Sequence, residues 1–93
     1  MLTIWVEGLL ISQKVAQKIR ERHGITSRQV REAVVRVAGL DFSWDFQSDR
    51  GVRAIVRTRI GDREENEALI VLYPTENPAD QTWRLGSAYY ILG

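Results

Sequence analysis

The eight residues from Leu40 to Gln47 constrain the fold of this chain more than any other segment. Large apolar side chains occupy every second position and polar side chains every position between them, without one exception. Successive side chains of a strand point to opposite faces of a sheet, so the pattern predicts a strand that is buried on one face and hydrated on the other. Its three aromatic residues, Phe42, Trp44 and Phe46, are expected to face a covering layer of helices.

Two short amphipathic helices are predicted before this strand. The first follows Ser12, a favourable N-cap residue, and ends at Gly24. The second begins with a capping box formed by Thr26 and Gln29, and its apolar stripe runs on to Gly39. Each helix needs a partner surface on which to bury its apolar stripe, and a sheet supplies it.

The remaining segments predict further strands of that sheet. They are Leu2–Val6, Val52–Ile60, Ala68–Tyr73 and Thr82–Leu92, the last with a bend or bulge near Gly86. The expected order is therefore β-α-α-β-β-β-β, an α+β fold with two N-terminal helices on one face of a mainly antiparallel sheet. Residues 1–93 are expected to form a single domain, because the chain is too short for two.

Composition excludes several classes of site. The chain has no cysteine and one histidine, so disulfides, thiolate metal sites and multi-histidine zinc centres are ruled out, and neither a metal nor a cofactor is expected. A formal net charge of +1 excludes a polybasic tail but not a local basic face. Neither a targeting segment nor an apolar run of the ~20 residues that cross a bilayer is found, so a cytoplasmic protein with no membrane partner is expected.

Side-chain parity directs several arginines to the face that the helices leave open. In the strand from Val52 to Ile60, alternation points Arg53, Arg57 and Arg59 away from the helices. Arginine makes up eleven of the 13 basic residues, and its planar guanidinium binds phosphate and stacks on bases, which suits single-stranded RNA. The alternative is that Asp41 and Asp45 on the same face form ordinary surface ion pairs with these arginines.

The last strand adds a second basic group to the open face. If its larger apolar set faces the helices, Arg84 and Tyr90 join the arginines outside. A bulge at Gly86 would reverse one half of the strand, so the choice between Tyr89 and Tyr90 stays open. Arg84 has no acidic neighbour in its own predicted strand, so the ion-pair interpretation applies less readily to it.

His23 lies at the end of the first predicted helix. The negative end of the helix dipole favours a protonated imidazole at this position. A helix C-terminus is also a common place for a surface histidine without a chemical role. Both interpretations of His23, a proton-transfer group and a surface residue, remain open.

A local motif and the element order resemble a known family. The motif is the segment Arg22-His23-Gly24-Ile25-Thr26 with the following Gln29-Val30-Arg31-Glu32-Ala33. It resembles the turn and the Glu-Ala helix of BrnT-like proteins, and the strand-helix-helix-sheet order resembles the wider RelE/ParE superfamily of bacterial toxins. The resemblance implies a toxin-like, metal-independent endoribonuclease of a type II toxin–antitoxin system. Its implied partners are RNA, with ribosome-bound messenger RNA among the candidates, and a cognate antitoxin that covers the basic face.

The resemblance also implies roles for particular residues. Arg57 and Arg59 correspond to basic residues on central strands, and Arg84 with Tyr90 to a late pair that acts on the scissile phosphate. The chain differs in having arginine on these strands where a lysine base is common. Transesterification of RNA also requires proton transfer, for which His23 and Tyr90 are the catalytic candidates.

Two further residues are expected to bind the substrate, and two alternatives to an enzyme remain open. Arg53 and Tyr89 are expected to contact the substrate beside the catalytic residues. The first alternative is a non-catalytic module that docks an acidic protein or a nucleic acid on the same basic face. The second is a structural subunit that pairs through an exposed edge strand, either Leu2–Val6 or Thr82–Leu92.

Overall fold

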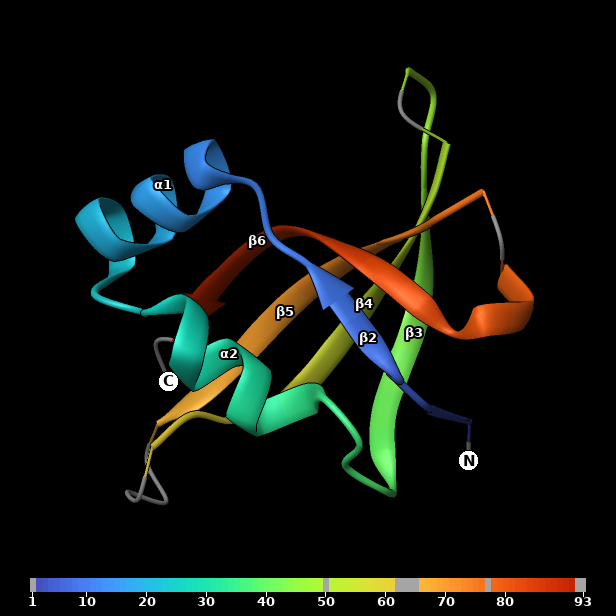
Figure 1. Ribbon diagram of the computed structural model, residues 1–93, viewed down its shortest axis with the longest axis horizontal. Coiled ribbons are helices and arrows are strands. Elements are labelled where there is room, and N and C mark those ends of the chain that lie inside the picture. The colour runs from blue at the N-terminus through green and yellow to red at the C-terminus, as the bar shows by residue number, and fades with distance from the viewer. Residues whose placement is uncertain (1, 50, 62–65, 77, 92–93) are drawn as a thin grey trace.

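The computed structural model describes residues 2–49, 51–61, 66–76 and 78–91. Two helices lie against one side of a curled, mixed sheet of six strands, so the expected α+β class is confirmed (Figure 1). The elements are β1 (Thr3–Ile4), β2 (Gly8–Leu10), α1 (Gln13–His23), α2 (Ser27–Val34), β3 (Leu40–Gln47), β4 (Gly51–Arg59), β5 (Glu67–Pro74), a 3₁₀ turn (Pro78–Asp80) and β6 (Thr82–Tyr90). The strands are ordered β1-β3-β4-β5-β6-β2 across the sheet.

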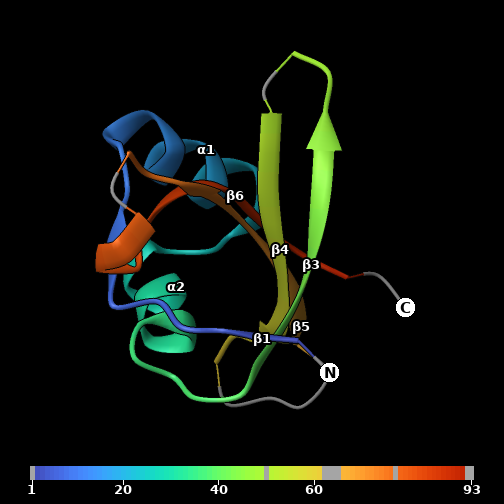
Figure 2. The same cartoon turned by 90° about the vertical axis from the view of Figure 1, so that its right-hand side faces the viewer.

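The N-terminal segment forms two strands, where the sequence predicted one over Leu2–Val6. β1 pairs antiparallel with β3 at one edge of the sheet, and β2 pairs parallel with β6 at the other edge. Only the three residues Trp5–Glu7 separate the two strands, so the sheet edges must approach each other and the sheet curls (Figure 2). Periodicity does not reveal the parallel partner, because β2 is too short to show an alternation.

Helix α1 begins and ends at the predicted residues. The side chain of Ser12 accepts a hydrogen bond from the backbone N–H of Val15 (3.1 Å). Gly24 terminates the helix in the left-handed conformation with φ of 67°, where a residue with a Cβ would be strained. These two caps fix the length of α1, and the helix lies along β6.

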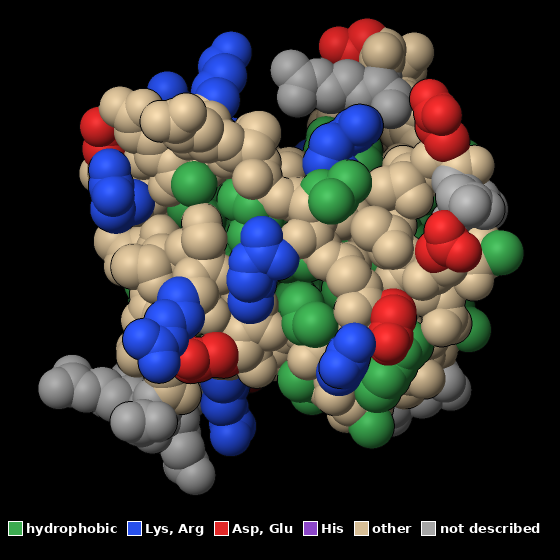
Figure 3. Space-filling view, in the orientation of Figure 1, with side chains coloured by type: hydrophobic (Ala, Val, Ile, Leu, Met, Phe, Trp, Pro, Cys, Tyr) green, Lys and Arg blue, Asp and Glu red, His purple; other side chains and the backbone are tan. Residues whose placement is uncertain are grey.

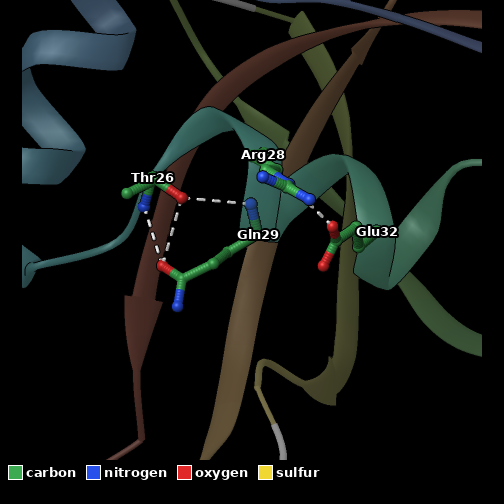
Figure 4. Close-up of polar contacts among 4 residues, drawn as sticks. All are labelled: Thr26, Arg28, Gln29 and Glu32. Carbon is green, nitrogen blue, oxygen red and sulfur yellow. Dashed lines mark hydrogen bonds and ion pairs between the residues drawn. The ribbon is translucent and has the colours of Figure 1, made fainter.

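Helix α2 has the predicted capping box. The hydroxyl of Thr26 accepts from the backbone N–H of Gln29 (3.1 Å), and the side-chain oxygen of Gln29 accepts from the backbone N–H of Thr26 (2.9 Å) (Figure 4). One turn further on, the Arg28 guanidinium donates to Glu32 (3.0 Å). The reciprocal bonds satisfy two N–H groups that a helix N-terminus otherwise leaves unpaired.

Replacing Thr26 with alanine is expected to lower the free energy of unfolding by about 1 kcal/mol, because the N-cap hydroxyl is lost. Urea denaturation of the two proteins measures this difference. Ser48→Ala, an exposed change outside the helices, serves as the control and should leave stability nearly unchanged. Equal stabilities for Thr26→Ala and the unchanged protein would show that the capping box does not stabilise α2.

Helix α2 ends earlier than its apolar stripe. The sequence predicted a helix that continues to Gly39, but α2 ends at Val34. The chain turns at Arg36, whose φ is 57° and whose N–H donates to the carbonyl of Val6 (2.8 Å). Pairing with the N-terminal segment thus replaces the last predicted helical turn.

The core lies between the helices and the concave side of the sheet. Its members are buried aliphatic side chains of both layers: Val6, Leu9, Ile19, Val30, Val34, Ala54, Val56, Ala68, Ile70, Leu72, Leu85 and Ala88. Trp44 and Phe46 point to the same side, opposite Ala54 and Val52, but remain 47% and 78% exposed. The prediction that helices cover both residues is wrong, because α1 lies along β6 and α2 ends after eight residues.

Candidate functional site

The side of the sheet away from the helices, here called the outer face, carries basic residues from two separated strands. Arg57 of β4 lies opposite Leu69 of β5, which in turn lies opposite Tyr89 of β6. Four residues further along β5, Tyr73 lies opposite Arg84. Residues that share a register position share a face, so the prediction that Arg57 and Arg84 point to the same side is confirmed.

The bulge predicted near Gly86 is present and decides which tyrosine reaches the outer face. The pairing shifts between Val71 and Leu72 of β5, and Gly86 is the extra residue on β6. Tyr89 consequently lies on the outer face, whereas Tyr90 lies opposite Ala68 and packs against the core. The expectation that Tyr90 joins Arg84 outside is wrong, because one inserted residue reverses the parity of everything that follows it.

A basic pocket lies where the bulge meets helix α1. Its volume is about 590 Å³, and it is open to solvent. Its walls come from the start of α1 and from β5 and β6: Ser12, Lys14, Val15, Lys18, Tyr73, Arg84, Leu85 and Gly86. Three of these side chains, Lys14, Lys18 and Arg84, are cationic at neutral pH. We call this hollow the Arg84 pocket.

Contacts inside the Arg84 pocket hold its groups in place. Lys18 Nζ donates a hydrogen bond to the carbonyl of Gly86 (3.0 Å). The guanidinium carbon of Arg84 lies over the ring of Tyr73, 6.0 Å from its centroid. Gly86 has no side chain, and a Cβ there would approach Tyr73 Cδ2 to 2.9 Å. The glycine therefore allows the tyrosine ring to lie against the bulge and to form an aromatic wall of the pocket.

Two of the outer-face arginines form ion pairs. Arg53 donates to Asp45 (2.6 Å), and the hydrogen bond to that carboxylate raises the pKa of Arg53. Arg57 donates to Glu67 (2.9 Å). Arg84, in contrast, has no carboxylate within ion-pair distance among the residues that the structure describes. The surface ion-pair interpretation therefore applies to Arg53 and Arg57, and Arg84 keeps its charge available.

The Arg57–Glu67 pair gives a pH dependence. The hydrogen bond from Arg57 lowers the pKa of the Glu67 carboxyl. The native state thus favours the ionised form, so the pair stabilises the fold above the ordinary pKa of glutamate, and this stabilisation is lost as pH falls through the lowered pKa. In an NMR titration of the side-chain carboxyl, Glu67 should titrate below the usual range and should return toward it in Arg57→Gln. Identical titration curves in the two proteins would contradict the ion pair.

The predicted catalytic residues do not meet at one point. The rings of His23 and Tyr89 lie 6.0 Å apart. His23 of α1 thus lies beside the row of residues Arg57, Leu69 and Tyr89, which are aligned across β4, β5 and β6. Four residues of β5 separate this row from the Arg84 pocket, which corresponds to about 13 Å along the strand. Arg59 lies at the end of β4, where it lines a different hollow together with Gln29 and Glu32 of α2.

Two basic residues of the pocket were missed by the sequence analysis. Lys14 and Lys18 are four positions apart on α1, and that spacing places both on one face of the helix. The spacing was visible in the sequence, but the strand that this face meets was not. The helix thus brings two lysines to the pocket, and β6 brings Arg84.

The opposite side of the molecule has a different character. On the side that carries the helices, Lys and Arg side chains are dispersed among acidic and hydrophobic ones (Figure 3).

Within residues 2–49, 51–61, 66–76 and 78–91, His, Asp and Glu do not gather into a group of three that would hold a metal ion. In the same residues, the helices are too short or too polar to cross a bilayer.

Comparisons of the chain with protein-family models, with curated proteins and with solved structures gave no match.

Proposed function

We propose that this chain binds single-stranded RNA on its outer face and cleaves it without a metal ion, as the RelE/ParE-type toxins that it resembles do. The observation that supports the proposal is the Arg84 pocket, whose lining combines three cationic side chains with the half-buried ring of Tyr73. Cations for the phosphate and a flat ring for the base are the combination that single-stranded RNA requires. Within the described residues, Arg84 forms no ion pair, although Glu76 and Asp80 line a second hollow beside it.

The proposed reaction is an internal transesterification. The 2′-oxygen of a ribose attacks the adjacent phosphorus, the bond from phosphorus to the 5′-oxygen breaks, and the products are a 2′,3′-cyclic phosphate and a 5′-hydroxyl. Negative charge grows on the non-bridging oxygens, and Arg84, Lys14 and Lys18 stabilise it from fixed positions. This electrostatic contribution is usually the largest one in such reactions.

Proton transfer completes the reaction. The proton of the attacking 2′-hydroxyl passes to solvent, and the departing 5′-oxygen must gain one. We assign this second step to the hydroxyl of Tyr73, because it is the pocket's phenol and Tyr90 packs against the core. His23 and Tyr89 lie in the neighbouring row, where they would contact an adjacent nucleotide together with Arg57.

The proposal extends to the partners that the resemblance implies. An antitoxin would inhibit the protein by covering the outer face together with the adjoining surface of α1, since residues of both form the pocket and the neighbouring pair of His23 and Tyr89. Inhibition of this kind requires no conformational change of the sheet. We also propose that the sheet has the RelE-like topology that the resemblance implies.

A cleavage assay in EDTA tests the proposal. Purified protein and purified ribosomes are incubated with end-labelled RNA, separately and together, and the products are examined for a 2′,3′-cyclic phosphate end. RNA with 2′-O-methyl groups is the matched control and should stay intact, because it lacks the attacking hydroxyl. Intact unmodified RNA under every condition would refute cleavage.

One observation favours a second function, binding without cleavage. His23, the single histidine of the chain, is not among the residues that line the Arg84 pocket, and its ring lies beside that of Tyr89 instead. In this alternative the same outer face docks a nucleic acid or an acidic protein. Its affinity would fall steeply with salt concentration, and RNA would be recovered unchanged.

A further inference from the structure

Strand β3 has an open edge along most of its length. β1 pairs only with Leu40 and Asp41, and among the described residues Phe42–Gln47 have a strand neighbour on the β4 side alone. The two edges predicted from the sequence offer less room: β1, the terminal strand from the Leu2–Val6 segment, has only two residues, and β6 of the Thr82–Leu92 segment pairs with β2 over Thr82–Arg84 and is contacted by α1. Residue 92 itself lies outside the described residues.

The open edge lacks the usual protection against pairing. Edge strands of soluble proteins are commonly short or bulged, or carry lysine or proline. β3 is eight residues long, contains neither lysine nor proline, and pairs with β4 in an uninterrupted register. Next to its free backbone groups lie the exposed Trp44 and Phe46, and the ring of Trp44 meets that of Phe42 edge-on at 5.2 Å.

We propose that β3 pairs antiparallel with β3 of a second copy of this chain, about a two-fold axis at Trp44. In this register Trp44 faces Trp44, Phe42 faces Phe46, and Ser43 faces Asp45. Aromatic residues then oppose aromatic residues on the concave side, and a hydroxyl opposes a carboxylate twice on the outer face. Five of the six free residues, Phe42–Phe46, are then paired, and the sheets of the two copies become continuous.

The charges of β3 disfavour the other symmetric registers. An axis at Ser43 brings Asp41 opposite Asp45 twice, and an axis at Asp45 brings that carboxylate opposite its own copy. An axis at Phe42 would need the edge of Leu40 and Asp41, which β1 already occupies. A two-fold axis midway between two residues of β3 is excluded, because it would oppose residues that lie on different faces of the sheet. An axis at Phe46 opposes no like charges but pairs only Asp45–Gln47 of β3. The register at Trp44 thus pairs the most free residues without opposing like charges.

Sedimentation over a concentration series, in the absence of RNA, tests the dimer. Ser43→Asp places a carboxylate opposite Asp45 at two points of the proposed interface and is expected to weaken dimerisation roughly tenfold or more. Ser43→Lys places an ammonium group at the same two points and is expected to strengthen dimerisation. Ser48→Asp is the matched control, since Ser48 is exposed and follows the paired segment.

Two results would overturn the proposal. One is a protein that stays monomeric up to about 1 mM, where even an association of only ~4 kcal/mol is detected. The other is a dimer whose dissociation constant is the same in Ser43→Asp, Ser43→Lys and Ser48→Asp, because it would then use another surface. Thermal unfolding of each variant verifies that the fold is intact. Neither result bears on RNA cleavage, which uses different residues.

Discussion

Replacing Arg84 with alanine is expected to slow RNA cleavage by about two to three orders of magnitude, the typical effect of removing one group that stabilises the transition-state charge. Arg84 is exposed, contacts the Tyr73 ring, and has no ion pair among the described residues. Its loss should therefore change the free energy of unfolding by no more than about 0.5 kcal/mol. The cleavage rate of bound RNA, measured with protein in excess, is the appropriate readout.

The matched control for Arg84→Ala is Arg28→Ala. It removes the same charge from helix α2, where Arg28 forms only an exposed pair with Glu32. The control should cleave RNA at nearly the unchanged rate. Equal rates for the two variants would mean that the Arg84 pocket is not the reaction site. Weaker RNA binding in Arg84→Ala, without cleavage by either protein, would instead identify the outer face as a binding surface.

Replacing Gly86 with alanine is expected to have the second-largest effect, a loss of about 1–3 kcal/mol in the free energy of unfolding. The new methyl group would overlap the ring of Tyr73, and Gly86 lies in the bulge where β5 and β6 shift register. The ring must move, which also removes the aromatic wall beneath Arg84. Urea denaturation measures the stability, and RNA affinity measures the damage to the pocket.

A double-mutant comparison isolates the cause of the Gly86 effect. In a Tyr73→Ala background the ring is absent, so the additional Gly86→Ala change should cost much less than it does in the unchanged protein. Gly8→Ala is the matched control, because a Cβ at Gly8 would meet Thr82 at an ordinary 3.4 Å. An equal cost of Gly86→Ala in both backgrounds would show that the bulge, not the Tyr73 ring, requires the glycine.

Local patterns predicted the elements whose signal lies within a few residues. The alternation in Leu40–Gln47 predicted β3 and the face of each of its side chains, and cap residues predicted both ends of α1 and the start of α2. Gly86 was expected to interrupt β6, and it does. In each case the physical cause, a pleat, a cap or a missing Cβ, is a property of neighbouring residues.

Features that depend on distant partners were not predictable. The parallel pairing of β2 with β6 has no local signature, and the N-terminal segment was therefore expected to form one strand. Exposure of Trp44 and Phe46 follows from how far the helices extend over the sheet, which periodicity does not report. Alternation gives the face of a residue, but not whether anything covers that face.

In the candidate site, too, features with a local signal were predictable and contacts between distant segments were not. Parity placed Arg57 and Arg84 on one face, but the offset of four positions along β5, from Leu69 to Tyr73, became known only from the register. Pairing of Asp45 with an arginine of this face was one of the two interpretations of the sequence, whereas the pairing of Glu67 with Arg57 was not expected. Lys14 and Lys18 became part of the pocket because α1 lies along β6, a tertiary contact with no sequence signal.

RNA is expected to contact the outer face at the Arg84 pocket. NMR mapping of backbone and arginine side-chain signals, during titration with a short 2′-O-methyl RNA that binds without being cleaved, locates the contact. The largest shifts are expected at Lys14, Lys18, Tyr73 and Arg84, smaller ones at Tyr89, and little change at Arg28 on α2. Shifts concentrated on α2 or around Trp44, with the pocket signals unchanged at saturation, would contradict this expectation.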